Sequence, residues 1–213
     1  MQRPNNMLTS LLTSLLAALL LALALPAAGQ DGQGAYAACV ACHGANAEGN
    51  SALKAPRLNH LAPVYISAQL QKYKSGVRGG EGGSVTGAQM APMAMTLADD
   101  AAINAVAEYI AGLEGGPSPV AVEGDVALGA DYYNQFCGAC HGAAAEGNLA
   151  LNSPRLAGSD DWYLAEQIRA FRAGERGAHP DDRTGKQMRA MAMVLPNEQA
   201  IADVVAFIRS LSE

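Results

Sequence analysis

The four cysteines of this 213-residue chain fall into two pairs, and a histidine directly follows each pair. The first group is Cys39, Cys42 and His43, and the second is Cys137, Cys140 and His141. Two thiols on one helical turn can add to the two vinyl groups of a porphyrin, and the following histidine is then held at the iron as its proximal ligand. The spacing therefore predicts two covalently attached haems of the c type.

Paired cysteines also occur in sites other than haem attachment motifs. A Cys-x-x-Cys pair also occurs in redox dithiols and as half of a zinc site. An exported chain could instead join four cysteines in two disulfides. None of these alternatives explains why a histidine follows both pairs, so the sequence favours haem at both motifs.

Methionine is the better candidate for the second axial ligand. His60 and His179 do not occupy matching positions in the two halves of the chain, which disfavours two bis-histidine haems. Beyond residue 29, every methionine lies in one of two triplets, Met90, Met93 and Met95 or Met188, Met191 and Met193. Methionine also fills gaps in cores, but confinement to two equivalent segments, expected to be loops, favours one ligand in each triplet. A His/Met iron has no open position, which favours electron transfer over chemistry on a substrate.

Spacing that is repeated in the two halves of the chain also suggests what surrounds each haem. Pro56 and Pro154 lie at the same distance after their histidines, and each carbonyl could accept the second ring N–H of its histidine. The alternative is an ordinary turn proline. Arg57 and Arg155 follow and could pair with haem propionates, or they could be solvated surface arginines.

These residues sit within an internal duplication. From Cys39 to Leu113 the second half repeats the first at a constant offset of 98 residues, without a gap. Residues 99–113 and 197–211 carry apolar side chains at helical spacing, and residues 65–73 and 162–171 predict a middle helix. A short leading helix, such as residues 131–136, precedes each cysteine pair. The glycine-rich segments 76–87 and 174–185 predict loops, and no alternating strand pattern is present. The prediction is an all-α fold.

The ends of the repeats predict the domain organisation. Residues 1–29 are typical of an export signal, because Arg3 precedes a Leu/Ala run over residues 8–25 and a small-residue exit. We expect this segment to be cleaved, with an uncleaved membrane anchor as the alternative. A first domain (30–114), a Gly/Pro linker (115–125) and a second domain (126–213) follow. The net charge of -6 argues against a nucleic-acid partner.

The sequence resembles class I cytochromes c, and its tandem arrangement is similar to the di-haem cytochrome c4 family, from about residue 34 to the C-terminus. The resemblance is carried by the two attachment motifs, Pro-Arg-Leu after each, then Tyr-x-x-x-Gln, then Met-x-x-Met before a leucine. It implies two tandem class I cytochrome c-like haem domains packed face to face. It also places the axial ligand at the first methionine of each triplet, Met90 and Met188, with Met93 and Met191 as alternatives. The third methionines, Met95 and Met193, depart from the family pattern.

The resemblance also implies a function. It predicts a periplasmic electron carrier, not an enzyme, that passes electrons from a quinol-oxidising complex to a terminal oxidase and is able to associate peripherally with the membrane. One alternative is a cytochrome subunit of a dehydrogenase, for example a flavocytochrome sulfide dehydrogenase. Another is a di-haem peroxidase, which needs one iron with an open position and is disfavoured by the matching methionine segments.

Overall fold

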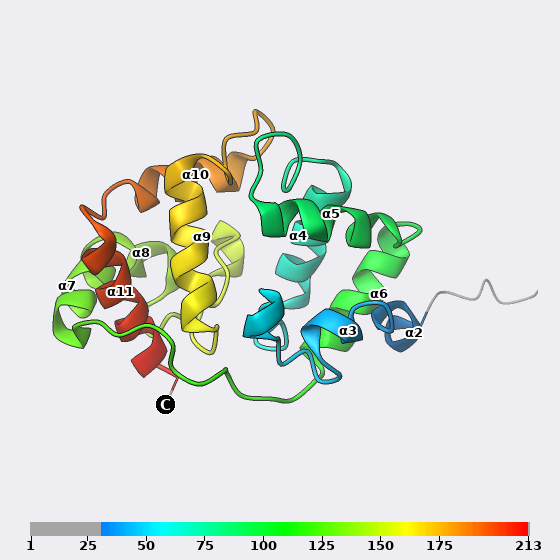
Figure 1. Ribbon diagram of the computed structural model, residues 1–213, viewed down its shortest axis with the longest axis horizontal. Helices are drawn as coiled ribbons and strands as arrows, with labels where there is room; N and C mark the ends of the chain where they lie inside the picture. Colours follow the sequence, from blue (N-terminus) through cyan, green and yellow to red (C-terminus); the bar gives the residue numbers. More distant parts are fainter. Residues whose placement is uncertain (1–30, 213) are drawn as a thin grey trace, which may run out of the picture. The chain divides into compact units, whose positions relative to one another are not determined.

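The computed structural model describes residues 31–212, which are almost entirely helical (Figure 1). The expected signal, residues 1–29, lies outside the described residues, so its cleavage stays a prediction. The elements of the first domain are α2 (Gly32–Tyr36), α3 (Val40–His43), the 3-10 turn η1 (Ser51–Leu53), α4 (Pro63–Lys74), α5 (Val85–Met95) and α6 (Asp100–Ala111). The second domain repeats this order with α7 (Val126–Phe136), α8 (Gly138–His141), η2 (Leu149–Leu151), α9 (Asp161–Ala173), α10 (Arg183–Ala192) and α11 (Glu198–Ser210).

The predicted all-α fold is confirmed for these residues. Between residues 31 and 212 the only β-type pairings are isolated bridges, Asn50 with Ala55 and Asn148 with Ser153. No helix in the same range is long and apolar enough to cross a membrane. The predicted middle and last helices are confirmed, with ends that differ by a few residues.

The methionine segments are helices, not loops, and in this respect the sequence-based expectation was wrong. α5 begins at Val85 and α10 at Arg183, inside the stretches that their glycines had marked as loops. Ser84 and Asp182 cap these helices, and each side chain accepts a hydrogen bond from a backbone N–H in the first turn. Such caps stabilise a helix start by about 1 kcal/mol, a gain comparable to the cost of one glycine in a helix.

The last helix of each domain forms the centre of its hydrophobic core. The predicted apolar stripes are confirmed, and their buried side chains include Ile103, Val106 and Ile110 in α6 and Ile201, Val204 and Ile208 in α11. Burying a side chain of this size stabilises the fold by roughly 1.5–3 kcal/mol. The leading helix packs across the last one at a glycine. A Cβ on Gly129 would collide with the backbone oxygen of Asp203, and one on Gly32 would collide with that of Ala105.

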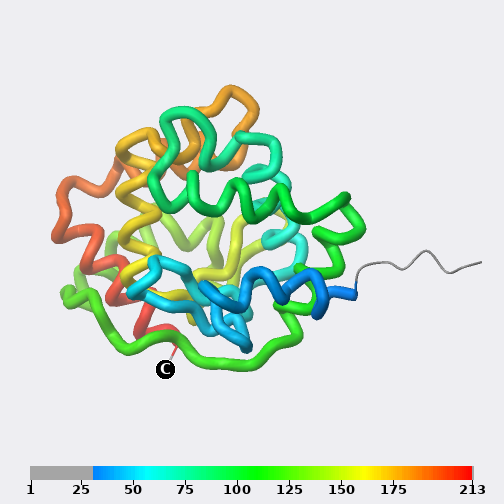
Figure 2. Tube along the Cα trace, turned by 45° about the vertical axis from the view of Figure 1, so that its right-hand side comes forward, coloured from blue at the N-terminus to red at the C-terminus, as the bar shows by residue number. Residues whose placement is uncertain are grey.

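The linker is attached to the second domain along part of its length. It contains no helix and runs from the end of α6 to the start of α7 (Figure 2). Asp160 and Asp161 are 1% and 0% exposed, and both accept hydrogen bonds from linker backbone. Ser118 N–H donates to Asp160 at 3.0 Å, and Ala121 N–H donates to Asp161 at 2.7 Å. The linker is therefore held by buried carboxylates that no periodicity in the sequence had indicated.

Direct contacts also join the two domains. They are Lys54 Nζ to Glu166 Oε1 at 2.5 Å, Ser159 Oγ with His60 Nε2 at 2.7 Å, and the Arg57 N–H to Asp160 Oδ2 at 2.8 Å. Residues 31–212 accordingly belong to one compact unit.

The helix crossing at Gly129 leads to a stability prediction. We expect Gly129→Ala to lower the free energy of unfolding by about 1–3 kcal/mol, because the new methyl group overpacks the contact between α7 and α11. Gly116→Ala is the matched control, since a Cβ at Gly116 would meet nothing within 4 Å. Guanidinium denaturation of both haem-loaded variants measures the effect. Equal midpoints for the two variants would contradict this packing argument.

Candidate haem centres

Each attachment motif forms a single short helix that brings its three functional side chains together. Cys39 is the N-cap of α3, Cys42 lies within the helix and His43 ends it, with its backbone N–H bonded to the Cys39 carbonyl at 2.9 Å. α8 has the same arrangement, with Cys137, Cys140 and His141. Both helices stop at a glycine with positive φ, 83° at Gly44 and 84° at Gly142. Two thiols and one imidazole are thus presented from one turn in both domains.

The two imidazoles are oriented by the predicted proline carbonyls. His43 Nδ1 lies 2.8 Å from the Pro56 oxygen, and His141 Nδ1 lies 2.9 Å from the Pro154 oxygen. Because each carbonyl can only accept, Nδ1 carries the proton and Nε2 keeps its lone pair. Burial lowers the pKa of both histidines, which keeps the rings in the neutral form that binds metal.

The second imidazole provides a direct test of fit to an iron. His141 is 4% exposed, and its Nε2 is buried without a hydrogen-bond partner among the described residues. A buried polar atom left unpaired costs about 1–3 kcal/mol. A metal at Nε2 would remove this cost, so the site fits the iron of a haem.

The thiols do not have the character of a redox dithiol. Burial raises the pKa of Cys39 and raises that of Cys137 to about 11. Redox-active cysteine pairs instead depend on a lowered pKa that exposes a thiolate. Cys42 and Cys140 are exposed, and all four sulfurs are free. This pattern favours stable attachment over thiol exchange.

The cavity beside His43 reaches the methionines of α5. His43, Leu58, Leu97, Met90 and Met93 all contribute to its lining. Met95 does not line this cavity and is 59% exposed, and the equivalent Met193 is 60% exposed. In the first domain, the methionines that line this cavity are the predicted ligand Met90 and its alternative Met93. Met90 and Met188 are half-buried and stay the predicted ligands.

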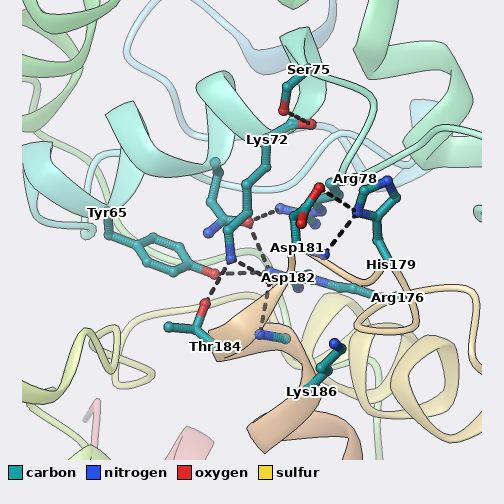
Figure 3. A network of polar contacts seen from close by, with 12 residues as sticks. Tyr65, Lys72, Ser75, Arg78, Arg176, His179, Asp181, Asp182, Thr184 and Lys186 are labelled. Atoms are coloured by element: carbon teal, nitrogen blue, oxygen red, sulfur yellow. Dashed lines mark hydrogen bonds and ion pairs between the residues drawn. The ribbon is translucent and has the colours of Figure 1, made fainter.

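A cluster of arginines, tyrosines and glutamines from both domains borders this cavity, and all of its members except Arg176 contribute to the lining. We call it the arginine cluster, and it consists of Tyr65, Gln69, Arg78, Tyr163, Gln167 and Arg176. Arg78 donates to Tyr163 Oη and Gln167 Oε1, both at 3.0 Å, across the domain boundary. Arg176 donates to Tyr65 Oη of the first domain at 3.1 Å (Figure 3). It also donates to Gln69 Oε1 at 3.0 Å.

The arginine cluster suits an anionic group. Arg78 is 9% exposed, and its hydrogen-bond partners within residues 31–212 are all neutral. A guanidinium buried without a counter-charge is costly, and the propionates of a haem would supply that charge. Arg78 and Arg176 lie outside the motifs that predicted the haem sites, although they match at the 98-residue offset.

Arg57 and Arg155, the earlier candidates for the propionates, are occupied elsewhere. The Arg57 side chain donates to the Gly158 carbonyl at 2.7 Å and also to the carbonyl of Gly115 and the side chain of Asn59. Arg155 Nε donates to the Ala157 carbonyl at 3.0 Å. In this structure both arginines brace backbone near the domain boundary.

The histidines outside the motifs are also engaged elsewhere. His60 Nε2 contacts Ser159 at the domain boundary, and His179 Nδ1 accepts the Asp181 N–H at 3.1 Å. Burial lowers the pKa of His60 to about 3, and the positive charges of Arg57 and Arg155 act in the same direction. His60 is therefore an uncharged structural residue of the interface.

Comparison with known proteins shows which family and which proteins the chain is similar to. A family profile described as Cytochrome c matches residues 29–114 and again residues 126–212. A thiosulfate dehydrogenase electron acceptor from Thiomonas intermedia is 36% identical over 154 residues, which cover 68% of this chain and 67% of that protein. Cytochrome c4 from Azotobacter vinelandii is 32% identical and covers 84% of this chain, which in turn spans 87% of it.

Solved structures agree with these sequence matches. Cytochrome c4 from Acidithiobacillus ferrooxidans superposes with a TM-score of 0.66 at 27% identity, over 81% of this chain and 98% of that one. Thiosulfate dehydrogenase from Marichromatium purpuratum gives a TM-score of 0.65 at 28% identity over 83% of this chain. The present chain spans only 38% of that longer protein.

The assignment of Met90 to the first iron, which the family resemblance implies, can be tested against Met93, the other methionine that lines the cavity. We expect Met90→Ala to remove half of the sulfur-to-iron absorption band of the oxidised protein, because each of the two haems contributes one such bond. Met93→Ala is the matched control and should leave the band intact. Absorption spectra of the two haem-loaded variants provide the measurement. A band halved by Met93→Ala and preserved in Met90→Ala would move the assignment to Met93.

His60 predicts a specific acid sensitivity. The unfolded chain binds a proton at this position below about pH 6.5, whereas the folded chain does so only near pH 3. The free energy of unfolding therefore falls as the pH is lowered from about 6.5 to about 3. We expect His60→Gln to show a shallower loss of unfolding free energy over this range. Urea denaturation at several pH values measures the slope, and identical slopes in both proteins would contradict the prediction.

Proposed function

Because this chain belongs to the cytochrome c family, as a di-haem electron carrier similar to cytochrome c4, we propose that it works in the periplasm between a quinol-oxidising complex and a terminal oxidase. Export is supported by the signal-like residues 1–29. Two haem c groups, one on each Cys-x-x-Cys-His motif, are its cofactors. The proposal assigns His43 and Met90 to the first iron, and His141 and Met188 to the second.

The observation that carries the proposal is the arrangement of His43 and its cavity. The ring donates through Nδ1 to Pro56, which leaves Nε2 free, and the cavity lined by His43 extends to Met90. A metal bound between such residues has no position left for a substrate. A bound haem c would supply a one-electron iron couple, and the residues that line this cavity would surround it.

The residues of the chain favour transfer without rearrangement. Pro56 fixes the imidazole, and two thioether bonds would fix the porphyrin edge at Cys39 and Cys42. Apolar side chains such as Leu58 and Leu97 exclude water from the cavity. A site held in this way has little to reorganise when its charge changes, which suits a carrier that cycles between two oxidation states.

A dehydrogenase is the second candidate donor. The relative from Thiomonas intermedia is described as an electron acceptor of thiosulfate dehydrogenase, and its identity to this chain supports the same role here. The two candidates differ in the donor and share the carrier chemistry. They can therefore be separated by one kinetic comparison.

The donor is tested by following haem reduction in the oxidised, purified protein. We expect a quinol-oxidising complex supplied with quinol to reduce both haems at least about tenfold faster than quinol alone, since carriers of this kind are reduced through protein docking. A parallel reaction with thiosulfate dehydrogenase and thiosulfate tests the second donor. Reduction only by the dehydrogenase would replace the quinol-oxidising complex as donor.

The same preparation checks the premises of this test. Intact-mass measurement should give the chain without residues 1–29 and with two haems attached. Failure of both donors to reduce a protein of that mass would reject the proposed place between respiratory complexes.

A further inference from the structure

One ion pair between the domains breaks the symmetry of the duplication. Lys72, on α4 of the first domain, lies 2.6 Å from Asp182 Oδ1 of the second domain and 2.7 Å from Thr184 Oγ1 (Figure 3). The Asp182 side chain is 2% exposed and the Lys72 side chain 22% exposed. This pair is much more deeply buried than the Lys54–Glu166 pair, whose side chains are 53% and 31% exposed.

Asp182 is also the residue on which helix α10 begins. It is the N-cap of this helix, and its Oδ1 accepts the Gly185 N–H at 2.9 Å. A carboxylate at this position both satisfies a free N–H group and interacts favourably with the helix dipole. α10 carries Met188, so the first domain contacts the start of the helix that bears the proposed ligand of the second haem.

The first domain lacks the equivalent arrangement. At the 98-residue offset, Asp182 corresponds to Ser84 and Lys72 corresponds to Ala170. The Ser84 hydroxyl accepts the Gly87 N–H at 3.1 Å, and its contacts within residues 31–212 stay inside its own domain. The start of α5, which bears Met90, is therefore capped without a residue of the second domain.

We propose that Lys72 is a positioning residue through which the first domain holds the Met188 helix of the second domain. The arrangement is asymmetric, because among residues 31–212 no side chain of the second domain caps α5 in the same way. This inference rests on the proposed assignment of Met188 as an iron ligand. Removal of Lys72 leaves a buried carboxylate without its counter-charge, and the first turn of α10 must then move to hydrate it.

The test is Lys72→Met in the haem-loaded protein, because methionine keeps an unbranched apolar stem of similar length. Hydrogen exchange should be faster in α10 and unchanged in α5. In a Met90→Ala background, the remaining sulfur-to-iron band reports on the second haem. We expect the equilibrium constant for this bond, followed during denaturant titration, to fall by roughly tenfold or more. In a Met188→Ala background, the band of the first haem should keep its midpoint.

Two further variants separate this role from a general weakening of the domain boundary. Lys54→Met removes a second cross-domain ion pair without touching α10, and it should leave the exchange of α10 unchanged. The double variant Lys72→Ala with Asp182→Ser reproduces the first-domain arrangement, and it should recover part of the midpoint, because no unpaired carboxylate is left although the cross-domain contact stays broken. This rescue also shows that a loss in Lys72→Met is not a failure to fold.

The outcomes distinguish the inference from the function on which it rests. If Met90→Ala and Met188→Ala each fail to remove half of the band, the proposed ligation is wrong. If both do so but Lys72→Met leaves α10 exchange and the second-haem midpoint unchanged, the positioning role alone is overturned. An equal effect of Lys54→Met on α10 would likewise overturn it.

Discussion

The hydrogen bond from a histidine ring to a proline carbonyl is the constraint on which both haem centres depend. The attachment helix delivers the imidazole, but the contact of Nδ1 with Pro56 or Pro154 decides that Nε2 is the free nitrogen and where it points. Proline suits this position because it offers a carbonyl and has no N–H to compete. The same contact in both domains, at 2.8 and 2.9 Å, makes the two metal positions alike at their proximal side.

Some contacts at the domain boundary follow the symmetry of the duplication, and others do not. In the arginine cluster, Arg78 and Arg176 each donate a hydrogen bond to a tyrosine of the opposite domain. The contacts are therefore symmetric across the boundary. The Lys72–Asp182 pair has no such counterpart, because serine and alanine stand at the matching positions. Two haem centres with similar immediate surroundings can thus differ in how firmly the methionine-bearing helix, α5 or α10, is held.

Buried charge connects the parts of the chain outside the haem cavities. Asp160 and Asp161 bind linker backbone, and Asp182 binds a lysine of the first domain. Each carboxylate is at most 2% exposed, yet each has at least two hydrogen-bond donors. Such groups are costly to leave unpaired, so they favour one docked arrangement of linker and domains over alternatives with similar apolar contact.

The sequence alone was enough to determine haem attachment, the duplication and the apolar faces of the last helices, because each depends on spacing within a turn or on regular periodicity. It also pointed to the histidine–proline contact through a distance repeated in both halves. The methionine segments were misjudged as loops, since their glycines are offset by the Ser84 and Asp182 caps. Only the tertiary structure could bring Lys72 to Asp182, which lies 110 residues further along the chain. Neither residue stands out locally, and the pairing exists because the two domains meet at that point.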